Sequence, residues 1–155
     1  MSIDFEAICE ALADRFEPAA IGTPSGAPAM RMAFAQVPKN VSVVPCVLLE
    51  VSDGSVIMST GTWNHQMNID VLFLLSKRPS DPDRVESNRQ RWLPYLLKAT
   101  QGQFKLGLGA ATGYSVNKAY PTTWSWDEYL VGGDTYDAIR VRYVVDVTET
   151  VTLVP

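Results

Sequence analysis

The sequence predicts an α+β fold in which two helices pack on a mainly antiparallel β-sheet with a long C-terminal strand. Two segments, near residues 3–16 and 82–100, carry apolar residues at helical spacing. Apolar and polar residues alternate instead near residues 139–148, which is typical of a strand with one buried face. The chain has 155 residues, the usual length of one domain, and we expect a single domain over 1–155.

Composition excludes several classes of function. The formal net charge of −4 argues against binding to phosphate backbones. The longest apolar run, residues 71–75, is too short to cross a bilayer, so we expect no membrane partner. Cys9 and Cys46 are expected to be buried free thiols, and with the single His65 they cannot supply a zinc site. We therefore expect no metal and no cofactor.

The first predicted element is a helix over residues 3–16. Ser2 is a suitable N-cap, and Asp4 and Glu6 place negative charge near the helix N-terminus, where it is stabilising. Pro18 ends the helix. The apolar stripe, which we expect to pack on the sheet, contains Phe5, Ile8, Cys9, Leu12 and Phe16.

A proline- and glycine-rich arm follows at about 18–40, and we expect it to be irregular. It contains one apolar stretch, which either folds over the core of its own chain or contacts a neighbouring subunit. Deletion of residues 19–37 is expected to leave the monomer folded and to weaken assembly. The candidate interface residues in this stretch are Met30, Arg31, Met32 and Phe34.

Strands follow the arm. Residues 45–51 and 55–59 read as a hairpin closed by Asp53-Gly54. A strand over 62–76 turns apolar on both faces in its later half, at Leu72 and Leu74, and we expect a helix to cover that half. The face expected to be buried along this strand carries Met67, Ile69, Val71, Phe73 and Leu75.

The second helix is expected to start at Asp81, as N-cap, and Pro82, and to reach about residue 100. Pro94 should bend it. Its apolar side contains Val85, Trp92, Leu93, Leu96 and Leu97, and its expected solvent side contains Arg84, Glu86, Asn88, Arg89, Gln90 and Arg91.

Three further strands are expected over 104–108, 114–120 and 122–131, and Gly132-Gly133 joins the last of them to the terminal strand. In the terminal strand Ile139, Val141, Tyr143, Val145 and Val147 share the face expected to be buried. Arg140 and Arg142 lie on the other face, which we expect to meet solvent or a neighbouring subunit. Both arginines are therefore candidate interface residues.

The residues with catalytic potential do not form a convincing set. The segment 107–113 lacks the third glycine and the following helix of a phosphate-binding loop. His65 has no serine in a nucleophile elbow to activate. We therefore expect a protein that is not an enzyme. Trp124, Trp126 and Tyr129 either complete the core or lie in a protein interface, where aromatic residues are enriched.

The order of elements resembles the tail terminator proteins of long-tailed bacteriophages and related tail-completion and head-to-tail joining proteins. The resemblance is carried by residues 5–12 (FEAICEAL), by 69–75 (IDVLFLL) ahead of Asp81-Pro82, and by 131–145 (VGGDTYDAIRVRYVV). It covers nearly the whole chain, although the arm at 18–40 has no counterpart in the family pattern.

This resemblance implies a structural protein of the virion, located in the tail near the neck and assembled in the host cytoplasm. The protein would form a ring, usually of six copies, on a finished tail tube. There it would stop tube polymerisation and join the tail to the head. The implied partners are further copies of itself, the tail tube protein and a head-completion or neck protein, with DNA passing through the ring without specific binding.

Two alternatives remain open. A head-closure or neck adaptor protein of related architecture would bind portal-side proteins instead of tube ends. A small α+β enzyme or ligand-binding domain would carry a pocket with convergent polar groups around His65 or Asp127.

Overall fold

A computed structural model of the chain describes residues 3–151 and confirms the predicted α+β class. One five-stranded sheet has the strand order β1-β2-β3-β5-β4, in which only the β1–β2 pair is parallel. The elements are α1 (Phe5–Asp14), α2 (Pro18–Ile21), β1 (Met32–Phe34), β2 (Cys46–Met58), β3 (Thr62–Lys77), α3 (Pro82–Leu97), β4 (Tyr114–Val131) and β5 (Asp134–Thr150).

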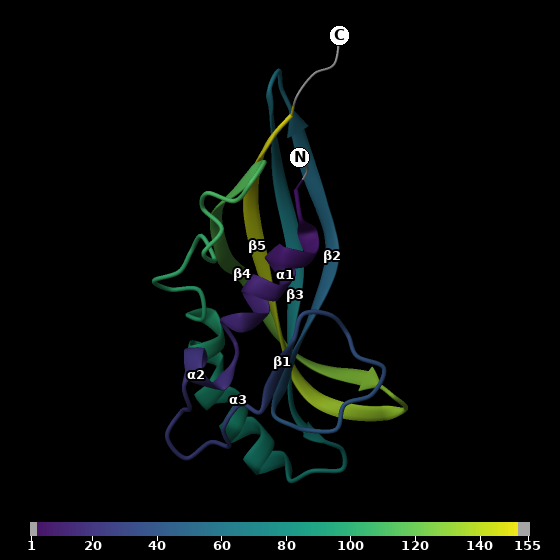
Figure 1. Cartoon of the computed structure of the whole chain (residues 1–155). Helices are drawn as coiled ribbons and strands as arrows, with labels where there is room; N and C mark the ends of the chain where they lie inside the picture. Colours follow the sequence, from purple (N-terminus) through teal and green to yellow (C-terminus); the bar gives the residue numbers. More distant parts are fainter. Residues whose placement is uncertain (1–2, 152–155) are drawn as a thin grey trace.

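The long strands form a curled sheet with both larger helices on one side (Figure 1). We call the side that carries α1 and α3 the helix face and the opposite side the open face. The β2–β3 hairpin extends beyond the helices at one end of the molecule, and the β4–β5 hairpin curls away at the other.

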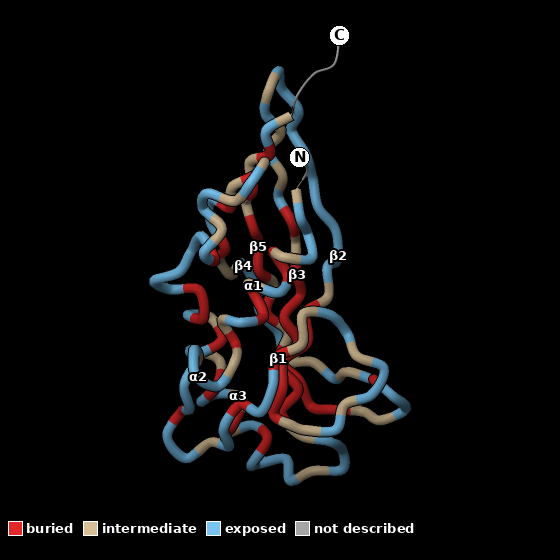
Figure 2. Tube along the Cα trace, viewed as in Figure 1, coloured by how far each residue is buried: buried red, intermediate tan, exposed pale blue. Residues whose placement is uncertain are grey.

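The main core lies between the helices and the helix face, where Figure 2 shows the buried parts of the strands. The ring of Phe16, which follows α1, meets Tyr143 of β5 edge to face at 5.7 Å between centroids. Trp92 of α3 packs 5.1 Å from Phe73 of β3. The predicted buried faces of the third and terminal strands are confirmed, since Met67, Ile69, Val71, Phe73, Leu75, Ile139, Val141, Tyr143, Val145 and Val147 all belong to this core.

A second cluster buries the later half of β3 on the open face. A helix was expected over this half of the strand. α3 does cover its helix face, where Trp92 packs on Phe73, but no helix covers Leu72 and Leu74. Because the sheet curls, the β4–β5 hairpin and the segment before β2 cover Leu72 and Leu74 instead. The cluster consists of Cys46, Leu48, Leu72, Leu74, Val131, Tyr136 and Ala138, with Phe34, Val41, Val44 and Tyr129 packed against it.

The N-terminus of α1 is capped by Asp4, whose Oδ1 accepts a hydrogen bond from the Ala7 amide at 3.0 Å. The expected cap, Ser2, lies outside the described residues. The helix is shorter than predicted, and Phe5 is 46% exposed instead of belonging to the buried stripe. The rest of that stripe is buried as expected.

The predicted turn at Asp53-Gly54 is wrong. β2 continues through both residues as one strand of 13 residues, with a bulge between Val51 and Asp53, and the chain reverses only after Met58. A Cβ atom on Gly54 would lie 3.0 Å from the Gln66 carbonyl oxygen, so glycine permits a close approach of two strands here.

The arm at 18–40 is more ordered than predicted. It contains α2 and β1, and Met30 is only 2% exposed within the main core. β1 pairs with the start of β2 over Cys46–Leu48. The structure therefore argues against the expectation that residues 19–37 are dispensable for folding, because their removal would open the core.

No strand forms over residues 104–108. This segment is a series of turns that follows the outer edge of β4, and the amides of Val116 and Ala119 donate to the carbonyls of Leu108 and Phe104. The expected strands at 114–120 and 122–131 are one strand, β4, with bulges at Val116/Lys118 and Pro121/Thr123. The α3 start at Asp81 and Pro82 is confirmed, and both cysteines are buried free thiols as expected.

Candidate subunit interface

The predicted interface residues of the arm are divided between core and surface. Met30 lies in the main core of its own chain and is only 2% exposed, so its side chain is not on the surface that a neighbour would contact. Phe34 is half-buried against the second cluster. Only Arg31 and Met32, of which Met32 is 43% exposed, present their side chains to the surface.

Trp124 and Trp126 lie together on the helix face of β4, with ring centroids 4.9 Å apart. Trp126 is half-buried against the main core, and the Arg89 guanidinium lies 5.6 Å from the centroid of its ring. Trp124 is 48% exposed. A large aromatic side chain at a sheet edge is a strong candidate for a contact with another protein.

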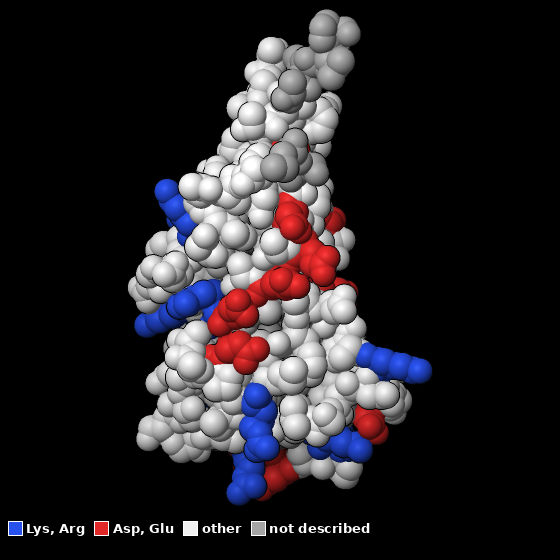
Figure 3. Space-filling model, viewed as in Figure 1, with Lys and Arg blue, Asp and Glu red and all other residues white. Residues whose placement is uncertain are grey.

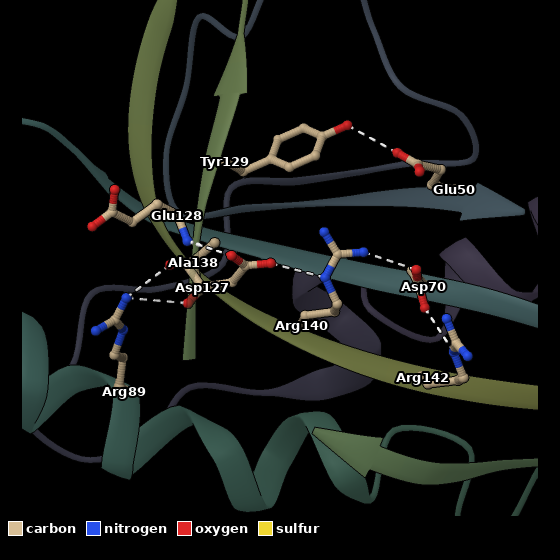
Figure 4. A network of polar contacts seen from close by, with 9 residues as sticks. All are labelled: Glu50, Asp70, Arg89, Asp127, Glu128, Tyr129, Ala138, Arg140 and Arg142. Atoms are coloured by element: carbon tan, nitrogen blue, oxygen red, sulfur yellow. Dashed lines mark hydrogen bonds and ion pairs between the residues drawn. The ribbon is translucent and has the colours of Figure 1, made fainter. Parts of the chain in front are cut away.

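Tyr129 points to the opposite face and takes part in a polar network there. Its hydroxyl donates to the Glu50 carboxylate at 3.0 Å (Figure 4). Burial raises the pKa of Tyr129 above its usual value, and the bond to Glu50 raises it further. Tyr129 is therefore tied to β2 of its own chain.

Arg140 and Arg142 are also engaged within the chain, since both bind Asp70, which is 3% exposed (Figure 4). Arg140 Nη1 lies 2.8 Å from Asp70 Oδ2, and Arg142 Nε lies 3.1 Å from Asp70 Oδ1. Arg140 Nε also reaches Asp127 Oδ2 at 2.9 Å. The network holds β3, β4 and β5 together and leaves an open face whose charges are largely paired.

Arg89 belongs inside the fold and not on a solvent side of α3. Its Nη2 donates to the backbone carbonyls of Asp127 at 2.9 Å and Ala138 at 3.3 Å (Figure 4). Asn88 is buried as well. The sequence carried a signal for Arg89, because it lies four residues after Val85 and three before Trp92, on the apolar stripe.

Asp137 anchors the loop that precedes α3. It accepts hydrogen bonds from Ser80 Oγ at 2.6 Å and Arg78 Nε at 2.8 Å. Burial alone would raise the pKa of Asp137, but the bonds from Ser80 and Arg78 outweigh burial and hold this pKa below its usual value. No local pattern in the sequence pointed to this contact.

Both outer edges of the sheet have long unpaired stretches within residues 3–151. On β2, β1 pairs only with Cys46–Leu48, which leaves the edge beyond Leu48 without a strand neighbour. On β4, the turns at 104–108 reach only as far as Ala119. Unpaired edges offer free backbone hydrogen-bonding groups to another chain. Apolar side chains exposed on these edge strands are Val51, Val56, Ile57, Met58, Trp124 and Leu130.

A groove of about 690 Å³ lies under α1, beside the part of β2 that has no strand neighbour on its outer edge. Its walls are mostly apolar, and Glu6 and Glu10 of α1 line one side. Neither acid forms an ion pair within residues 3–151, and Figure 3 shows the band of acidic side chains that crosses this region of the molecule. The lining residues are Phe5, Glu6, Cys9, Glu10, Ala33, Phe34, Ala35, Gln36, Pro38, Leu49 and Val51.

The only histidine is bound to a carboxylate. His65 Nε2 lies 2.9 Å from Glu149 Oε1, and Glu149 Oε2 accepts the Ile3 amide at 2.9 Å. The bonds from Ile3 and His65 lower the pKa of Glu149. A hollow of about 340 Å³ beside His65 is lined mostly by polar side chains, among them Asn64, Gln66, Asn117 and Asp146.

Within residues 3–151, no group of three or more histidine, cysteine or acidic side chains is placed to hold a metal ion, and no helix is long and apolar enough to cross a membrane. No protein-family model matches the chain, and a search of curated proteins finds no match. The free sheet edges, with their exposed apolar side chains, and the groove are the main candidate functional surfaces.

Proposed function

We infer that this protein is a structural component of a phage virion: a ring-forming tail terminator that caps the tail tube, stops its polymerisation and joins the tail to the neck. The observation that carries this proposal is a sheet open at both outer edges, with exposed apolar side chains on each edge strand. The sequence resemblance to tail terminators supplies the biological setting.

The two edges differ from each other, which favours a head-to-tail arrangement. The edge of β2 carries a groove, whereas the edge of β4 carries exposed Trp124. Contacts between two different surfaces of identical subunits produce closed rings when the rotation closes. A ring would also remove both free edges, which otherwise favour uncontrolled association.

The charge distribution fits a ring through which DNA passes. On the open face Asp70, Asp127, Arg140 and Arg142 neutralise one another. A surface of this kind, in a chain with a net charge of −4, offers little attraction to phosphates. We propose that the further partners are the tail tube protein and a head-completion or neck protein.

The proposal has a related alternative and an unrelated one. A head-closure or neck adaptor would use the same open edges to form a ring but would bind portal-side proteins. A small enzyme or ligand-binding domain is favoured by one observation, the polar hollow beside His65. The His65 imidazole itself is turned to the helix face, where Nε2 is bonded to Glu149 and the ring packs edge to face on Phe5 of α1.

Tail tube assembly in the presence of the purified protein tests the proposal. Tube protein from the same phage is polymerised with and without this chain, and tube lengths are measured by electron microscopy. A tail terminator is expected to shorten the tubes and to decorate one end. Binding to portal-side proteins with no effect on tubes would favour the neck adaptor and contradict the terminator.

A further inference from the structure

Trp124 and the groove lie on opposite edges of the sheet at the same height, by which we mean the same position along the strands. Trp124 pairs with Val141, Val141 with Val71, and Val71 with Leu49, which lines the groove. All four side chains are on the helix face, because directly paired residues share a face. We call a set of residues that pair directly across the four strands a row. The next row on this face, toward the β2–β3 turn, joins Pro121 on β4 to Val51 on β2 through Tyr143 and Ile69.

Neither edge has a strand neighbour at this height within residues 3–151, although residues 35–38 of the arm line the groove beside Leu49 and Val51. On β2, pairing with β1 stops at Leu48, one residue before Leu49. On β4, the backbone bonds from the turns at 104–108 stop at Ala119, before Pro121 and Trp124. A neighbouring subunit related by rotation about an axis along the strands would therefore bring its Trp124 beside Leu49 without any shift along the strands.

We propose that Trp124 of one copy of this chain docks into the groove between α1 and β2 of the next copy. The inference rests on the proposed ring and names the contact that closes it. The groove offers apolar walls for the indole ring, and it is large enough for an aromatic side chain. Glu6 and Glu10 at its side are acceptors for the indole N–H, which needs a partner when it is buried.

Charge favours this head-to-tail contact over a symmetric one. Glu6 and Glu10 are exposed beside the free edge of β2, whereas Lys105 and Lys118 are exposed on the flank of β4, and none of them is ion-paired within residues 3–151. Pairing β2 with β2 of a second copy would bring the acids of both copies together. Pairing β4 with β4 would leave the groove empty.

The lysine and the acids also match in height. Lys118 belongs to the row that runs through Asp146 and Gln66 to Ser55. Ser55 and Phe5, at the start of α1, line the same small hollow. Lys118 projects from the open face of β4, because its paired residues Asp146 and Gln66 do, whereas Glu6 lies on the helix face. The proposed contact therefore brings the basic and acidic residues to the same edge at the same height without an ion pair between Lys118 and Glu6.

Cysteine cross-linking tests the contact while Trp124 is kept in place. In a Cys9→Ala background, which removes the thiol in the groove, we combine Val51→Cys with Pro121→Cys, the two residues of one row. A short bifunctional maleimide is expected to produce a ladder of covalent oligomers. Either cysteine alone is expected to give no cross-linked product, because the two thiols lie on different surfaces.

Trp124→Ala in the double-cysteine chain is expected to reduce the ladder by about tenfold or more, since a few buried aromatic side chains carry most of the binding energy of an interface. Tyr95→Ala is the matched control, because Tyr95 is an exposed aromatic residue of α3 and lies on neither edge strand. This control is expected to leave the ladder unchanged. Circular dichroism of each variant establishes that the monomer is folded.

The outcomes separate this contact from the proposed function. Dimers from either single-cysteine chain would mean a symmetric contact and overturn the inference, as would a ladder that survives Trp124→Ala. Rings seen by electron microscopy without any cross-link would overturn the contact and leave the tail terminator proposal intact. A chain that stays monomeric with tail tubes present, and gives no cross-link, would overturn both.

Discussion

Asp70→Ala tests whether the ion-pair network on the open face stabilises the curled sheet. Asp70 accepts hydrogen bonds from Arg140 at 2.8 Å and Arg142 at 3.1 Å, and its own side chain is almost fully buried. Its removal leaves two guanidinium groups side by side on β5 with one carboxylate, Asp127, to share. We expect a marked loss of stability.

The expected loss is about 2–3 kcal/mol in the free energy of unfolding. Hydrogen bonds to charged groups contribute about 1.5–3 kcal/mol each, and breaking a fully buried ion pair costs about 3–5 kcal/mol. Two features make the expected loss of stability smaller than these values would add up to. Arg140 keeps Asp127 as a partner, and the side chains of Arg140 and Arg142 are 31% and 42% exposed, so water replaces part of the lost interaction.

Denaturant unfolding measured at two protein concentrations separates monomer stability from association. Asp53→Ala is the matched control, since Asp53 is an exposed acid on the same face that accepts a bond from Asn68, and its loss is expected to cost about 0.5 kcal/mol or less. Arg142→Gln added to Asp70→Ala should recover part of the loss. An Asp70→Ala effect no larger than the control would refute this account.

Three other predictions follow from the core and the buried acids. Val141→Asp should abolish folding in circular dichroism, because an unpaired charge would enter the main core; a folded variant would mean that the faces of β5 are misassigned. Met30→Asp should lower the melting temperature by more than Met32→Asp, since only Met30 is buried. The pKa values of Asp137 and Glu149 are lowered, so these groups stabilise the fold above their unfolded pKa values and lose that effect as the pH falls. Stability should therefore drop below about pH 4.5, and Asp137→Asn should flatten this dependence; an unchanged slope would contradict it.

The sequence predicted those parts of the fold that local patterns specify. The buried face of β5 followed from strict alternation, and the start of α3 followed from Asp81 and Pro82. The prediction of a turn at Asp53-Gly54 was wrong because pairing between β2 and β3 outweighed the local preference of these two residues for a turn. β3 continues beside β2 through this point, and a bulge absorbs the extra residue.

The candidate interface was harder to predict, because it depends on strand order and register. The sequence identified Trp124 as a residue of either the core or an interface. Its alignment with Leu49 across the sheet depends on β4 pairing with β5, β5 with β3 and β3 with β2. The meeting of Arg140 with Asp70 depends on the same pairing, across 70 residues of sequence. Residue spacing along the chain cannot supply this information.

Electron microscopy of the purified protein, alone and with tail tubes, tests the central claim most directly. The account predicts closed rings, of six copies if the resemblance to tail terminators holds, that sit on one end of each tube and stop its growth. A chain that remains monomeric at high concentration, and leaves tube ends bare and tubes still growing, would contradict it.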